Sequence, residues 1–143
     1  MTCDEQAACG RETTALTGEH DLIVEGRQVD QVFLPGEPLV VSHAEYRLEN
    51  MASHATTCTI QSCHFIENGT TIPLGVFHIY AGDLLPEKVI VIPPKSDLNI
   101  RVTFPFHDVH VGVNFRYAVQ LNLECGDRLY IATSRLNIIQ EKP

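Results

Sequence analysis

Hydrophobic and polar residues alternate with a period of two along most of the chain after Gly18. Two segments, Asp97–Phe104 and Arg116–Glu124, keep this alternation throughout. Successive side chains of a strand point to opposite faces, so the apolar side chains of each segment share one face. One buried face and one solvated face are typical of antiparallel sheets. The pattern therefore predicts a β-strand at each of the two segments.

Seven further segments are predicted to be strands. They are Leu22–Glu25, Val29–Leu34, Leu39–Leu48, Thr56–Ile66, Ile72–Tyr80, Lys88–Ile92 and Arg128–Ile139. Asn68-Gly69 supplies the positive φ angles that a tight turn needs, so we expect the two strands on either side of it to pair as a hairpin. Cys125-Gly126-Asp127 predicts a second hairpin between Arg116–Glu124 and Arg128–Ile139.

One segment has a second interpretation. His43–Met51 places Ala44, Arg47, Leu48 and Met51 at the i, i+3, i+4, i+7 spacing of an amphipathic helix. A short helix at this segment therefore remains an alternative to the strand.

The spacing of strands and turns predicts the fold class. Strands that recur every 8–14 residues or so, with Pro- and Gly-rich turns between them, favour a sandwich over alternating strands and helices. We therefore expect an all-β protein, an antiparallel β-sandwich of about 7–9 strands. The 143 residues fit one domain. Residues 1–18 are polar and predict a flexible acidic arm, followed by a single domain over residues 19–143.

The later part of the chain resembles a known superfold. Pro93-Pro94-Lys95-Ser96, leading into the alternating segment Asp97–Phe104, is similar to the later strands of immunoglobulin-like sandwiches. The resemblance is one of architecture and covers about residues 20–140. The chain has no Trp, so the Cys…Trp…Cys signature of true immunoglobulin domains is absent. The resemblance implies an immunoglobulin-like fold and names no activity, since such folds host many unrelated functions.

The charge of the chain excludes two classes of partner. Ten Lys and Arg against eighteen Asp and Glu give a net charge of −8. A nucleic-acid binder or a protein that binds anionic membranes needs a basic face, so neither is expected. No apolar run approaches the ~20 residues of a membrane helix, and no signal peptide is recognisable, so we expect a soluble, cytoplasmic protein.

The cysteines suggest a reducing compartment and one kind of catalytic site. There are five, an odd number, at positions Cys3, Cys9, Cys58, Cys63 and Cys125. Cys58 and Cys63 are predicted to lie on opposite faces of a strand, so we expect free thiols. A small enzyme with a Cys–His pair is one functional alternative, with Cys58, Cys63 or Cys125 as the nucleophile.

The histidines define a candidate metal site. His107 and His110 flank Asp108 just after a predicted strand, and imidazole nitrogen is a good ligand for Zn²⁺ and Cu²⁺. His64 and His78 lie on the two strands that are predicted to pair, so they are possible further ligands. A His-based metal-binding protein for Zn or Cu is therefore a second alternative. Apart from such a metal, no cofactor is expected.

The preferred function follows from apolar residues in places where loops and edges are usually polar. These residues are Ile72, Leu74, Val76, Phe77, Leu84 and Leu85. Exposed apolar patches and open sheet edges mark surfaces that bind other chains. The sequence therefore predicts a non-catalytic protein-binding or assembly module that binds a protein partner, or self-associates, through a sheet edge or an exposed apolar loop.

Overall fold

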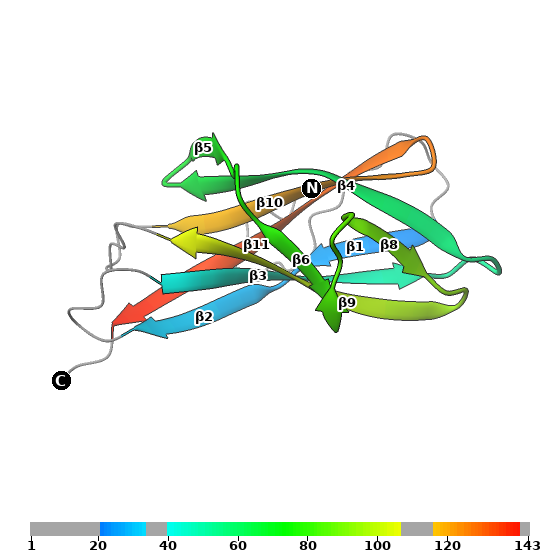
Figure 1. Cartoon of the computed structure of the whole chain (residues 1–143), viewed down its shortest axis with the longest axis horizontal. Coiled ribbons are helices and arrows are strands. Elements are labelled where there is room, and N and C mark those ends of the chain that lie inside the picture. Colours follow the sequence, from blue (N-terminus) through cyan, green and yellow to red (C-terminus); the bar gives the residue numbers. More distant parts are fainter. Residues whose placement is uncertain (1–20, 34–39, 107–115, 141–143) are drawn as a thin grey trace, which may run out of the picture.

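The computed structural model of the protein describes residues 21–33, 40–106 and 116–140 (Figure 1). Eleven strands in this part of the chain form two sheets. The described residues include no helix that is long and apolar enough to cross a bilayer. The predicted arm, residues 1–18, lies outside the described residues, so the domain boundaries remain a prediction.

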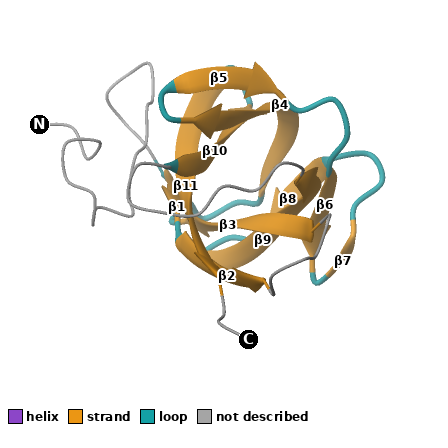
Figure 2. Cartoon of the chain, turned by 90° about the vertical axis from the view of Figure 1, so that its left-hand side faces the viewer, coloured by secondary structure: helices purple, strands orange, loops and turns teal. Residues whose placement is uncertain are grey.

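The two sheets face each other as the layers of a sandwich (Figure 2). The five-stranded sheet has the order β1 (Leu22–Gly26), β3 (Val40–Asn50), β9 (Ser96–Phe106), β6 (His78–Ala81) and β7 (Asp83–Leu84). The six-stranded sheet has the order β2 (Gln28–Phe33), β11 (Arg128–Gln140), β10 (Tyr117–Cys125), β4 (Thr56–Glu67) and β5 (Thr70–Pro73), and β8 (Val89–Ile92) also pairs with β4. The predicted immunoglobulin-like β-sandwich is confirmed.

Both predicted hairpins are confirmed. Asn68 and Gly69 have φ angles of 48° and 90° and connect β4 to β5. Positive φ at both central residues is the geometry for which Asn-Gly is preferred. Gly126, with a φ of 68°, begins the turn between β10 and β11.

The alternative helix at His43–Met51 does not form. This segment lies in β3 as far as Asn50, with Ala44, Tyr46 and Leu48 buried between the sheets. The period-two pattern prevails because these side chains face the core from an extended strand that is paired on both sides, with β1 and with β9.

The prediction of one strand over Ile72–Tyr80 is wrong. β5 ends at Pro73 in one sheet, and β6 begins at His78 in the other. The last bond of the β4–β5 ladder runs from the Leu74 N–H to the Cys63 carbonyl, and Gly75 follows in the link to β6. The chain crosses between the sheets at this link, which also raises the number of strands above the expected 7–9.

Among the described residues, one pair of neighbouring strands is parallel, and all the others are antiparallel. β1 pairs antiparallel with β3, whereas β2 pairs parallel with β11. β1 and β2 are two halves of one extended stretch that changes sheets at Arg27, so both run in the same direction. Their shared direction makes β2 parallel to its neighbour in the second sheet.

Buried polar groups tie this crossing to both sheets. The Ser134 hydroxyl on β11 donates a hydrogen bond to the Arg27 carbonyl at 2.6 Å and accepts one from the Glu45 N–H at 3.2 Å. Deeper in the core, the Tyr46 hydroxyl on β3 donates to the Val119 carbonyl on β10 at 2.5 Å. Burial raises the pKa of the Tyr46 phenol well above its ordinary value, so this group stays a neutral donor.

Asn50 closes one end of the sandwich. Its buried side-chain amide donates to the carbonyls of Ile92 and Pro93, both at 3.1 Å, and its carbonyl accepts from the Ala52 N–H at 3.0 Å. These bonds fix the turn after β3 against the end of β8, and they satisfy the polar atoms of the Asn50 side chain, which is buried.

Candidate functional site

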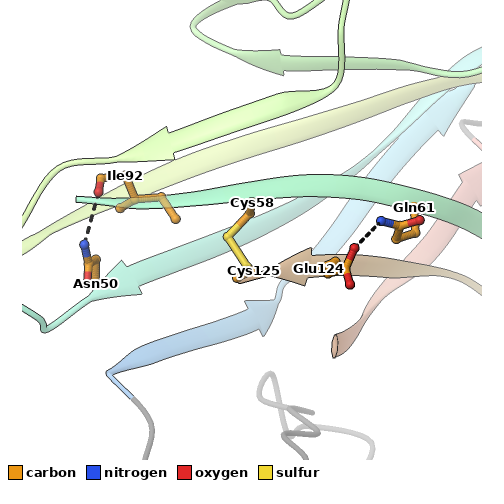
Figure 3. The surroundings of a disulfide bond; sticks show 6 residues. All are labelled: Asn50, Cys58, Gln61, Ile92, Glu124 and Cys125. Carbon is orange, nitrogen blue, oxygen red and sulfur yellow. Dashed lines mark hydrogen bonds between the residues drawn. A yellow bond between two sulfur atoms is a disulfide. The ribbon is translucent and has the colours of Figure 1, made fainter. Parts of the chain in front are cut away.

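Cys58 and Cys125 form a disulfide bond between β4 and β10 (Figure 3). The two residues are direct partners in the antiparallel register, and their Cα atoms are 4.2 Å apart. The expectation that these two cysteines are free thiols is therefore wrong. They are separated by 67 positions in the sequence, and only the pairing of β4 with β10 brings them together.

Cys63 is the free cysteine of the described residues, and it is buried. Burial raises the pKa of its thiol to about 12, although the positive charge of Lys88 acts in the opposite direction. A thiol with this pKa stays protonated at neutral pH and is a poor nucleophile. Its side chain faces the core. The side chain of the next residue, His64, lies on the other face of β4.

The three cysteines that the structure describes therefore do not support a Cys–His catalytic pair. Cys58 and Cys125 are bonded to each other, and Cys63 is a buried, protonated thiol. Cys3 and Cys9 lie outside the described residues.

The predicted convergence of His64 and His78 is wrong. His64 lies on β4 opposite Pro73, whereas His78 lies on β6 in the other sheet, opposite Thr103. The two strands do not pair, because the segment that was expected to carry His78 beside His64 changes sheets before it reaches His78. His107 and His110 lie outside the described residues, so their metal site remains a prediction. Within residues 21–33, 40–106 and 116–140, no group of three His, Cys, Asp or Glu side chains could hold a metal ion.

His64 instead belongs to a polar cluster on the outer face of the six-stranded sheet. The amide nitrogen of Asn122 lies 3.3 Å from the Ser62 hydroxyl and 3.2 Å from Nδ1 of His64. Because an amide nitrogen only donates, Nδ1 accepts and Nε2 carries the proton of the neutral ring. The alternation placed Asn122 on the solvated face, but it assigned Ser62 and His64 to the face of Cys58 and Ile60. A bulge at Gln61 reverses the faces of β4, so Cys63 joins Cys58 in the core and Ser62 and His64 turn outward.

The outer face of the other sheet carries an ion-pair network around Arg47. Its guanidinium lies 2.8 Å from Asp97, 3.2 Å from Glu25 and 3.3 Å from Glu49. The hydrogen bond to Asp97 is the main reason that the pKa of Arg47 is raised. The network connects β1, β3 and β9 across the surface, and we assign it a structural role.

Shallow hollows on the two outer faces offer no built ligand site. One is lined by residues that include Arg27, Tyr80 and Arg101, and another contains the Ser62–His64–Asn122 cluster. No buried side-chain nitrogen or oxygen atom of the described residues lacks a hydrogen-bond partner. Neither hollow therefore contains an orphaned polar group that a ligand would satisfy.

The predicted partner-binding residues divide into two groups. Leu74, Phe77 and Leu85 are partly buried and pack against the core. Ile72, Val76 and Leu84 are 46%, 61% and 46% exposed. All six lie in or next to the β5–β7 segment, residues 70–84, which runs from the edge of one sheet to the edge of the other.

The two groups have different roles in this segment. The N–H of Leu74 donates to the Cys63 carbonyl at 2.9 Å, and the N–H of Leu85 donates to the Ile79 carbonyl at 2.8 Å. The Lys88 ammonium lies 4.3 Å from the centre of the Phe77 ring. The partly buried side chains thus fix the segment to the sandwich, while the exposed ones are presented to solvent.

Comparisons with known proteins bear on the fold. A scan against protein-family models finds no match, and a search of curated proteins finds no relative. Among solved structures, the chain is similar to an ASH/PapD-like domain of human CEP192 (PapD-like domain 7), with a TM-score of 0.50 and 13% identity. The match covers 85% of this chain and 87% of that one. This likeness shows the fold alone.

Two further structures are more distant. The CooA pilin subunit of enterotoxigenic Escherichia coli has a TM-score of 0.41 and 9% identity over 83% of this chain and 99% of that one. A family 123 glycoside hydrolase from Clostridium perfringens has a TM-score of 0.44 and 12% identity over 80% of this chain, and the match covers 24% of the hydrolase chain. The architecture of the chain is that of an immunoglobulin-like β-sandwich.

Proposed function

We propose that the protein is a non-catalytic protein-binding or assembly module whose interface is the β5–β7 segment. The observation that carries this proposal is the exposure of Ile72, Val76 and Leu84 on a segment that is anchored to the core by its other apolar residues. Burying exposed large apolar side chains against a partner is favourable, because it removes them from water.

The anchoring of the β5–β7 segment to the core favours a binding role, because an anchored segment is better suited to binding than a mobile loop. A segment that is already ordered loses little conformational entropy when a partner binds it, so more of the contact energy appears as affinity. The backbone hydrogen bonds of Leu74 and Leu85 and the packing of Phe77 supply this order before binding.

The charge of the chain indicates the kind of partner. At −8, the protein attracts a basic partner from a distance, and this attraction weakens as salt is added. The segment itself contains Asp83 as its only charged side chain. We therefore expect apolar contacts to supply the affinity and the wider acidic surface to affect the rate of association.

The Cys58–Cys125 disulfide is informative about the cellular compartment in which the protein functions. Disulfide bonds persist in oxidising compartments and are rare in the cytosol. The pairing of Cys58 with Cys125 therefore argues against the expected cytoplasmic location, and we propose that the protein functions in an oxidising compartment.

The binding role is tested by site-specific cross-linking. A photoreactive phenylalanine analogue replaces Val76 in one chain and Met51 in another, because both side chains are exposed and Met51 lies outside the segment. Each chain is irradiated in material from the cells that contain the protein, and adducts are identified by mass spectrometry. We expect a discrete protein adduct from position 76 and none from position 51.

A second substitution makes the test specific. Ile72→Asp places a charge in the proposed interface and should abolish the adduct from position 76, with the far-UV circular dichroism spectrum unchanged. Adducts of equal yield from both positions, or none from position 76, would refute the proposed interface.

A further inference from the structure

β8 is an edge strand of unusual composition. It pairs with β4 on one side, and no strand in the described part of the chain pairs with its other side. Its four residues, Val89–Ile92, are Val-Ile-Val-Ile, with no charge, Gly or Pro. Edge strands of natural proteins are usually protected by a Lys, a Pro, a bulge or a cover, because their free backbone groups are a template for another strand.

The backbone groups of two residues point to that free side. The Ile60 N–H donates to the Lys88 carbonyl at 2.9 Å, which makes these two residues a hydrogen-bonded pair of β4 and β8. Such pairs alternate along an antiparallel ladder, so Ile90 and Ile92 also direct their backbone groups toward β4. Val89 and Val91 then direct their N–H and C=O groups away from it.

The side chains of the same two residues are the exposed ones. Val89 and Val91 are 37% and 57% exposed, whereas Ile90 and Ile92 are buried in the core. The residues of β4 that pair with them, Thr59 and Thr57, are also exposed and uncharged. β8 therefore presents both free backbone groups and apolar side chains at one edge.

Charged residues flank β8 but do not lie in it. Glu87, which is exposed, and Lys88 precede the strand, and the Lys88 ammonium lies over the Phe77 ring, 4.3 Å from the centroid. The Glu124 carboxylate accepts a hydrogen bond from the Gln61 amide at 3.0 Å (Figure 3). The edge itself is thus neutral on a protein of net charge −8.

We propose that this edge pairs with the β8 strand of a second copy of the chain, antiparallel and about a two-fold axis. The neutral edge has no charge that would attract a charged partner. Two copies of the uncharged Val-Ile strand can pair with each other without bringing like charges together. A two-fold interface uses the same surface on both copies, as this one does.

The register follows from the backbone. Val89 of one copy lies opposite Val91 of the other, so each pair exchanges N–H and C=O groups. Pro93 has no N–H, and Lys88 has a φ of 58°, so the pairing is limited to the residues between them. The two six-stranded sheets then become one continuous sheet through the dimer. This proposal goes beyond the proposed function, since it involves a different surface and does not require the β5–β7 segment.

Sedimentation equilibrium of the full chain at increasing concentration tests the proposal, together with amide exchange measured by NMR. We expect a monomer–dimer equilibrium, with the Val89 and Val91 amides gaining protection as the dimer forms. The Ile90 and Ile92 amides should be protected at every concentration. Val91→Lys places a charge at the edge and should raise the dimer dissociation constant by about tenfold or more.

A matched variant and a backbone variant complete the design. Leu129→Lys introduces the same charge at an exposed apolar residue of β11, outside both proposed interfaces, and should leave the dissociation constant unchanged. Val91→Pro removes one outward N–H while leaving the pairing of β8 with β4 intact, and it should weaken the dimer in the same way as Val91→Lys.

Four results would overturn the proposal. They are a monomer at all concentrations, a dimer that Val91→Lys does not weaken, Val89 and Val91 amides that are already protected in the monomer, and protection that appears only when a foreign protein is added. Cross-linking from position 76 is a separate readout, so failure of this dimer leaves the proposed β5–β7 interface standing, and the reverse also holds.

Discussion

At Gly26, where the chain leaves one sheet for the other, the backbone passes directly against β11. A Cβ atom added to Gly26 would lie 1.7 Å from the Thr133 carbonyl oxygen and 2.3 Å from its carbonyl carbon. Both atoms belong to the backbone of a central strand, so no side-chain rotation relieves the clash. The φ angle of Gly26 is not in the left-handed region, so the close approach alone accounts for the glycine.

Gly26→Ala should therefore lower the free energy of unfolding by about 3 kcal/mol, at the upper end of the usual cost of overpacking. Gly75→Ala is the matched control, because nothing lies within 4 Å of a Cβ at that position. Its stability should stay within about 0.5 kcal/mol of the wild type. Urea unfolding followed by circular dichroism measures both, and equal stability of the two variants would show that β1 crosses β11 elsewhere.

At the scale of single residues, the sequence predicts whether a side chain faces the core or solvent better than it predicts which residues that side chain contacts. The alternating pattern assigned inward and outward positions correctly for Tyr46 and for Asn122. It did not reveal the bond from Ser134 to Arg27, which joins residues far apart in the chain. Such contacts depend on which strands become neighbours, and local periodicity contains no information on that.

Among the elements, β4 and β10 are joined by both their ladder and the Cys58–Cys125 bond. In the chain-entropy account of disulfides, cross-linking residues 67 positions apart stabilises the folded state by about 4 kcal/mol. The gain arises in the unfolded chain, whose conformations the cross-link restricts.

The double substitution Cys58→Ala with Cys125→Ala should thus lower the free energy of unfolding by about 4 kcal/mol. A reductant should destabilise the wild type and have no effect on the double variant, while Cys63→Ala keeps the wild-type sensitivity. In protein taken from its own cells, Cys58 and Cys125 should resist alkylation under non-reducing, denaturing conditions. Alkylation of both residues would contradict the bond and the oxidising compartment.

The elements themselves were largely predictable, because most strands have one face in the core and one in water. β9 and β10 were found from this alternation, and both hairpins were found from Gly-containing turns. The Ile72–Tyr80 segment was not, since a run of apolar residues with little alternation does not show where the chain changes sheets. The candidate metal ligand His78 was misplaced for the same reason.

The parallel pairing of β2 with β11 was also missed, because here too the sequence pattern does not show where the chain changes sheets. A strand that crosses from sheet to sheet has the same period of two before and after the crossing. The break at Gly26-Arg27 looks like an ordinary gap between strands, although the chain direction does not reverse there.

For the whole molecule, net charge sets how readily copies approach one another. The −8 charge at pH 7 counts the seven histidines as neutral, and their protonation gives −8 + 7 = −1 before any carboxylate is neutralised. Histidine is the side chain that acquires charge between pH 8 and 5. Repulsion between copies therefore falls with pH and nearly vanishes close to the pI of about 5.2.

We expect self-association to increase as the pH is lowered from 7.5 to 5, measured by light scattering at constant protein concentration. Salt added at neutral pH should act in the same direction, because it screens the same repulsion. If the β8 edge is the contact that repulsion opposes, Val91→Lys should remain monomeric under conditions that dimerise the wild type. Equal association of the two proteins at pH 5 would instead indicate non-specific aggregation near the pI, and an unchanged wild-type monomer would show that net charge does not limit the contact.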